Sequence, residues 1–224
     1  YSNPESAYTY QIYEPLYGYH YLKRPYELIP KAAEAVAKPT YLDRNGQRLS
    51  ADAAPELIAE SVYDIRIKHG ILFQPHPAFA KDERGRARYL ALARGQLGDR
   101  RSPFAFEHQG TRELVADDFV YALKRHATTR IEAPVFSVFA EYVIGLKDYA
   151  KRIAEEDAAL LAGLPKDIRD KPFLDFRQWP LEGAQVLDRY TFRLRLKGKY
   201  PQLSYWMAMP FFAPLPWEAD AFYA

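Results

Sequence analysis

Two stretches of the chain, residues 62–73 and 189–200, alternate strictly between apolar and polar positions. This is the period of a β-strand with one buried and one wet face, so the pattern predicts two strands of an antiparallel sheet. We expect the arginines and lysines between the apolar positions to be solvated, edge-facing residues rather than a binding patch. The apolar positions are Tyr63, Ile65 and Ile67 in the first stretch, and Tyr190, Phe192, Leu194 and Leu196 in the second.

Helical spacing follows in the middle and at the end of the chain. Apolar residues recur at three- and four-residue steps from Val138 to Leu146, and the charged continuation to Leu161 predicts a second helix or an extension. A short apolar helix with a Pro-rich extended exit is predicted from residue 202 onward, and another short helix opens at residues 4–6. Strands early and late with helices between them indicate an α+β fold.

Residues 74–110 differ in character, with frequent Gly, Pro and Arg. From Lys81 to Arg101 there are seven basic residues against three acidic ones, and a short helix is predicted around residues 87–93. We interpret the segment as a solvated insertion. The alternative is an interaction module, in which residues 81–101 dock an anionic partner or a membrane surface.

Asp117 and Asp118 stand directly before an apolar-spaced run. Carboxylates in the first turn of a helix meet unpaired N–H groups and the positive end of the helix dipole. Helix initiation therefore explains both residues, and nothing in a solvated first turn would force them into an acid/base pair.

Composition narrows the function classes. The 224 residues are 48% hydrophobic and 27% charged, as in a globular protein, and the net charge of +2 argues against a dedicated nucleic-acid binder. Cysteine is absent, which excludes disulfides, thiolate metal sites and a cysteine nucleophile. No run of about 18 apolar residues predicts a membrane span. The tyrosines crowded into the first thirty residues are interpreted as half-buried packing rather than a recognition surface.

Candidate chemistry is sparse. The five histidines lack the spacing of a zinc-binding helix, no Gly-rich phosphate loop occurs, and no serine has the context of a nucleophile. We therefore expect no catalytic residue, no metal and no cofactor.

Five stretches in order resemble the bacterial extracellular solute-binding proteins of family 5, the oligopeptide- and dipeptide-binding components of ABC importers. They are IYEPLYGY (12–19), YELIPKAAEAV (26–36), YDIRIKHGILF (63–73), ELVADDFVYALKR (113–125) and LDRYTFRLRLKGKYPQLSYWMAMPFFAPLP (187–216). Two departures stand out. The family's threonine before Ala116 is Val115 here, so Asp117 is expected to cap the helix instead. The basic segment looks like an insertion.

The resemblance implies a fragment of a periplasmic-binding-protein-like fold of type II, the two-lobed Venus flytrap. The chain would be its N-terminal portion, with mixed or antiparallel sheet and flanking helices. Residues 1–13 would form the edge of ligand-binding lobe I, and residues 14–217 a small extra subdomain with the basic insertion at about 75–110. Residues 218–224 would return towards lobe I, and the second lobe would be absent.

The resemblance also implies a non-enzymatic receptor that binds a peptide or another small solute and delivers it to ABC permease subunits in the membrane. Its place would be the periplasm, or the outer face of the membrane as a lipoprotein. By family position, Tyr1, Ser2 and Asn3 would line the ligand cleft. Val135 falls where some members have a ligand-contacting tyrosine, and Phe136 is its neighbour.

Overall fold

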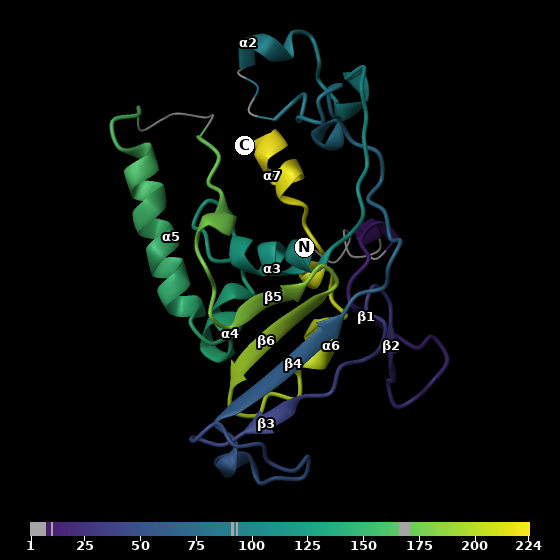
Figure 1. Cartoon of the computed structure of the whole chain (residues 1–224), viewed down its shortest axis with the longest axis vertical. Helices are drawn as coiled ribbons and strands as arrows, with labels where there is room; N and C mark the ends of the chain where they lie inside the picture. The colour runs from purple at the N-terminus through teal and green to yellow at the C-terminus, as the bar shows by residue number, and fades with distance from the viewer. Residues whose placement is uncertain (1–7, 10, 91, 93, 166–170) are drawn as a thin grey trace.

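The structure, a computed structural model, describes residues 8–9, 11–90, 92, 94–165 and 171–224. Figure 1 shows an elongated molecule with a β-sheet near its centre and a segment containing α2 projecting at one end. The predicted helix opening at residues 4–6 lies outside the described residues. Helices flank an antiparallel sheet, so the predicted α+β class is confirmed.

The sheet has four strands in the order β3-β4-β6-β5, all antiparallel. The strands are β3 (Thr40–Leu42), β4 (Glu60–Arg66), β5 (Ala184–Asp188) and β6 (Thr191–Lys197). The two strands predicted from alternation are therefore the central pair, β4 and β6. Their register sets Tyr63 opposite Leu194 and Ile65 opposite Phe192, and all four side chains are buried. The prediction of their apolar face is confirmed.

The polar face of β4 and β6 corrects one expectation. Arg193 pairs with Asp64 across the two strands at 2.7 Å, and Arg195 pairs with Glu60. Because these strands are central, the arginines are not edge-facing residues; opposite charges on neighbouring strands satisfy each other.

Helix α3 (Ala116–Arg125) packs on the buried face of the sheet. Phe119 stacks on Phe192 with ring centroids 5.6 Å apart, and Val120 and Leu123 are also buried. Burying a side chain of this size stabilises the fold by about 1.5–3 kcal/mol. The helix begins where the two aspartates predicted it, so that prediction is confirmed.

Two details of the start of α3 differ from expectation. The carboxylate of Asp118, not that of Asp117, accepts the backbone N–H of Val115 at 2.9 Å. The first turn is also not fully solvated, because Asp118 is only 2% exposed. Its role in the site is described below.

The stretch predicted as helical, Val138 to Leu161, consists of two helices, α4 (Phe136–Tyr142), which begins two residues earlier than predicted, and α5 (Leu146–Leu161). Gly145 separates them with a positive φ of 73°, a backbone conformation that favours glycine. The prediction of a second helix is confirmed. Near the end of the chain lie α6 (Leu203–Trp206), within the predicted apolar helix, and α7 (Trp217–Tyr223).

The tyrosine-rich start of the chain forms a hairpin of β1 (Tyr17–Tyr19) and β2 (Leu28–Pro30). Tyr17 is fully buried and its hydroxyl accepts the backbone N–H of Ala37 at 3.0 Å, whereas Tyr21 at the hairpin tip is 87% exposed. The expectation of half-buried packing therefore holds for part of this cluster only.

The basic insertion leaves the body between β4 and α3. The helix predicted at residues 87–93 is wrong for the residues described there: Lys81 and Ala87 form a β-bridge around a turn at Gly85, and helix α2 begins later (Arg94–Leu97). Short 3-10 helices complete the described elements, at Pro55–Leu57, Pro77–Phe79, Pro103–Ala105, Phe176–Gln178 and Pro210–Phe212.

Candidate functional site

Two hollows adjoin the loop that follows α3. We call the larger one, of about 680 Å³, the apolar hollow, and the smaller one, of about 240 Å³, the charged pocket. Both are lined by Arg125 and Ile131, so the end of α3 and the loop after it form the wall that the two hollows share.

The apolar hollow brings together segments that are far apart in the sequence. It is lined by Tyr13 near the start of the chain, by the loop up to Val135, and by the Pro-rich exit after α6. Val135 is half-buried, and both it and Phe136 pack against the main hydrophobic core. Of the predicted ligand-facing residues, the structure thus places Val135 in the wall of a hollow. Phe136 is not among the lining residues and is the first residue of α4.

His126 lies in the wall of the apolar hollow. Its Nε2 contacts the carbonyl oxygen of Phe211 at 3.0 Å, which requires a hydrogen on Nε2. Nδ1 is buried and has no hydrogen-bond partner among the described residues. Burial lowers the pKa of His126, so the neutral imidazole is favoured and Nδ1 carries a lone pair.

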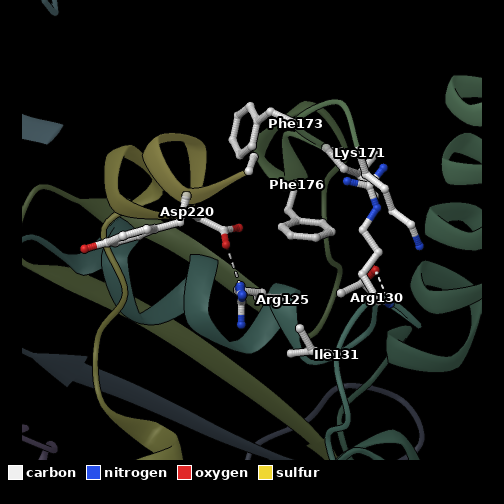
Figure 2. A pocket seen from close by; sticks show the side chains of 11 residues that line it. Arg125, Arg130, Ile131, Lys171, Phe173, Phe176 and Asp220 are labelled. Atoms are coloured by element: carbon white, nitrogen blue, oxygen red, sulfur yellow. Dashed lines mark hydrogen bonds and ion pairs between the residues drawn. The ribbon is translucent and has the colours of Figure 1, made fainter. Parts of the chain in front are cut away.

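The charged pocket joins α3 to α7, as Figure 2 shows. Asp220 accepts hydrogen bonds from the hydroxyl of Tyr121 and from Nε of Arg125, both at 2.8 Å. On the opposite side Arg130 pairs with Asp157 at 2.9 Å and donates to the carbonyl oxygen of Pro172 at 2.6 Å. Burial and the neighbouring Asp220 carboxylate raise the pKa of Tyr121, so this hydroxyl is a permanent donor.

Next to these hollows, Arg112 forms a buried ion network. Its guanidinium donates to both oxygens of Asp118, at 2.9 and 2.6 Å, and to both oxygens of Glu218, each at 2.7 Å. Burial raises the pKa of Asp118, and the hydrogen bonds with Arg112 oppose that rise. The network ties the root of the insertion to α3 and α7.

The network also excludes a simple acid/base reading of the aspartate pair. Asp118 has its two oxygens committed to Arg112, and Asp117 takes no part in the network. Within the described part of the chain, no group of three or more His, Asp or Glu side chains is arranged to hold a metal ion.

Tyr1, Ser2 and Asn3 lie outside the described residues, so their contact with a ligand stays a prediction. Sequence reasoning missed Arg112, Glu218 and Asp220, whose contacts join segments about one hundred positions apart. Only the spacing of Asp118, Tyr121 and Arg125 on one helix could have pointed towards this region.

The comparisons with known proteins concern the fold. No protein-family model matches the chain, and neither does any curated protein. Among solved structures, the chain resembles the pheromone receptor PrgZ, whose structure is described with its mode of peptide binding. The TM-score is 0.55 at 13% identity, covering 100% of this chain and 29% of that one.

Two oligopeptide-binding proteins resemble the chain less closely. OppA of Haemophilus influenzae, in complex with the peptide RPPGFSPFR, gives a TM-score of 0.46 at 16% identity, covering 96% of this chain and 27% of that one. OppA of Listeria monocytogenes, bound to peptide, gives 0.45 at 14% identity, covering 94% and 26%.

The likeness to PrgZ concerns the fold alone: the chain folds like part of that protein, as an α+β fragment, which is the class that the sequence predicted. The chain spans between 26% and 29% of the length of these three proteins. All three are described as peptide-binding proteins and not as enzymes.

Proposed function

We propose that this chain is part of an extracytoplasmic solute receptor, of the family 5 type, that delivers a peptide to an ABC importer. The observation that carries the proposal is the match of the whole chain to the fold of PrgZ. The five sequence stretches that resemble the family support it independently, because they occur in the same order from one end of the chain to the other.

Within this proposal, residues 1–13 belong to the edge of the first ligand lobe, residues 14–217 to an extra subdomain, and residues 218–224 to the return towards that lobe. A second lobe would close over the ligand. Each peptide backbone hydrogen bond contributes only about 0.5–1.5 kcal/mol net, so affinity would depend on enclosure by both lobes.

The apolar hollow is the part of the described structure that suits a ligand side chain. Its wall includes Val135, and Tyr13 brings the N-terminal segment to the same place. Tyr1, Ser2 and Asn3, which precede this segment, would then line the cleft alongside the ligand backbone. Val135 and Phe136 would supply apolar contact, a role tolerant of peptide sequence.

Calorimetry with a peptide library, on the complete protein and on the 224-residue chain, tests the proposal. We expect micromolar or tighter binding by the complete protein and much weaker binding by the chain alone. Tight binding by the chain alone would contradict the two-lobe mechanism. No peptide binding by the complete protein would remove the peptide ligand from the proposal.

The role of the hollow is tested separately in the complete protein. Val135→Asp places a charge in an apolar wall and should weaken peptide binding at least about tenfold, or about 1.4 kcal/mol. The matched control is Val186→Asp on β5, where the side chain is 43% exposed. Equal affinities of the two variants, both folded by circular dichroism, would exclude the hollow as a ligand contact.

The proposal places the protein on the outer side of the cytoplasmic membrane, free in the periplasm or lipid-anchored. None of the described helices is long and apolar enough to cross a membrane. Fractionation of cells that express the complete gene product checks this placement.

A further inference from the structure

The basic insertion forms a head on a two-armed stalk, seen at one end of the molecule in Figure 1, and Phe106 of this head packs against Phe222 of α7. The arms, residues 71–76 and 110–114, run antiparallel and are joined by backbone hydrogen bonds, among them His76 N–H to the Gly110 carbonyl at 2.8 Å. We call residues 77–109 the basic head. Nothing in the proposed peptide site uses this segment.

The stalk is held firmly to the body. Arg112, in the second arm, is the arginine that pairs with Asp118 and Glu218. His76, at the end of the first arm, contacts the hydroxyl of Tyr223 at 2.9 Å. Gly110 has no room for a side chain, because a Cβ there would lie 2.2 Å from the carbonyl oxygen of Phe79. The basic head is therefore presented in a fixed position and not on a loose loop.

The net positive charge of the molecule lies in the basic head. Seven basic and four acidic residues give residues 77–109 a net charge of +3, whereas the whole chain carries +2, so the remainder carries −1. Asp82 neutralises Arg86 through an ion pair at 2.8 Å. Five further cations are exposed and form no ion pair with any described carboxylate: Lys81, Arg84, Arg88, Arg100 and Arg101.

An exposed aromatic ring accompanies these cations. Phe104 is 93% exposed, three positions after Arg101. It lies on a short 3-10 turn that is fixed by its neighbours. Ser102 Oγ accepts the backbone N–H of Phe104 at 3.2 Å, and Gln109 donates to the carbonyl of Pro103 at 2.9 Å. The turn thus holds an exposed apolar ring close in sequence to the unpaired Arg101.

We infer that the basic head docks on an anionic lipid surface, with Arg84, Arg88 and Arg101 over the headgroups and Phe104 immersed at the interface. Cations attract a negatively charged leaflet, and a neighbouring aromatic ring gains by leaving water there. The almost neutral body adds little to this attraction, so the charge asymmetry turns the head towards the membrane. This goes beyond the proposed function, since it requires no peptide.

Co-sedimentation of the chain with lipid vesicles tests the inference. We expect binding to phosphatidylcholine vesicles that contain about 30% phosphatidylglycerol, little binding to phosphatidylcholine alone, and loss of binding in about 0.5 M NaCl. Arg84→Gln/Arg88→Gln should weaken binding about 25-fold, because each basic residue near an anionic surface contributes about fivefold. Phe104→Ala should weaken it at least about fivefold.

The matched control is Arg44→Gln/Arg48→Gln, which removes the same charge from the exposed loop after β3, at the opposite end of the molecule (Figure 1). This variant should bind anionic vesicles nearly as well as the unaltered chain. Equal losses in both double variants would mean that net charge alone is responsible, and would overturn the docking surface. Unchanged affinity of Phe104→Ala, or binding to an acidic protein but not to vesicles, would overturn the lipid interface.

Discussion

Removing the cation of the buried ion network should destabilise the protein far more than removing a cation from its surface. Arg112→Met keeps much of the side chain's length but leaves Asp118 and Glu218 facing each other without their shared guanidinium. The two carboxyl side chains are only 2% and 15% exposed, so water can replace little of what they lose.

The size of the effect follows from this burial. Breaking a buried ion pair by removing one partner costs about 3–5 kcal/mol, because a buried charge is left without compensation. The Arg112 side chain is itself 23% exposed, which favours the lower end, about 3 kcal/mol. The matched control is Arg193→Met on the wet face of the sheet, whose pair with Asp64 is exposed by 37% and 47%. Exposed pairs of this kind contribute about 0.2–1 kcal/mol.

Urea unfolding at neutral and at acidic pH measures the difference. Burial raises the pKa of Asp118 even with Arg112 present, and it should rise further in Arg112→Met. A carboxyl whose folded pKa exceeds its unfolded value binds its proton more tightly in the folded state. The free energy of unfolding of the variant should therefore increase as the pH falls through the folded pKa towards about 3.9, relative to the unaltered chain.

A second variant, in which the unpaired Asp118 carboxylate is also replaced by a neutral group, tests this reasoning. Arg112→Met/Asp118→Asn should recover part of the loss at neutral pH, because the neutral amide is cheaper to bury than the carboxylate. If Arg112→Met costs no more than Arg193→Met, or if its loss does not shrink at acidic pH, the buried network does not stabilise the fold as argued.

Three further predictions concern single side chains. Phe119→Ala should lower the free energy of unfolding, measured in urea, by about 3–5 kcal/mol, because the ring is 3% exposed and stacked on Phe192. Phe104→Ala removes a ring that is 93% exposed and should change the free energy of unfolding by no more than about 0.5 kcal/mol. Gly110→Ala should open the stalk and hasten tryptic cleavage at the arginines of the basic head. Gly46→Ala, which is strained by a positive φ of 76° but lies in the distant loop after β3, should leave that cleavage unchanged. Burial lowers the pKa of His126, so as the pH drops below about 6.5 the unfolded chain binds a proton at this position more readily than the folded chain does, and the free energy of unfolding should fall. In His126→Gln the melting temperature should lose this part of its pH dependence.

The core of the fold could be predicted from the sequence because its signals are local. Alternation in residues 62–73 and 189–200 depends only on which residues can face the core, and both stretches became the central strands β4 and β6. The same holds for α3, whose start is marked by Asp117 and Asp118. These signals need no knowledge of what packs against them.

The helix expected at residues 87–93 failed for a local reason that periodicity does not measure. The carboxylate of Asp82 accepts the backbone N–H groups of Arg84 and Arg86, at 2.9 and 2.8 Å, and Gly85 adopts a positive φ of 76°. This aspartate–glycine turn folds the chain back and pairs Lys81 with Ala87, at the point where the helix was expected to begin.

The site was harder to predict because its contacts are distant in sequence. Asp118 alone is indistinguishable from an ordinary helix-initiating carboxylate, and only Arg112 and Glu218 together show that it is buried and paired. The role of Asp220 likewise follows only from its hydrogen bonds with Tyr121 and Arg125, almost one hundred residues earlier in the sequence. In both cases α7 supplies the acid that completes a group on or next to α3. Glu218 and Asp220 therefore fix the position of α7, the last described helix, and α7 in turn forms one wall of the charged pocket.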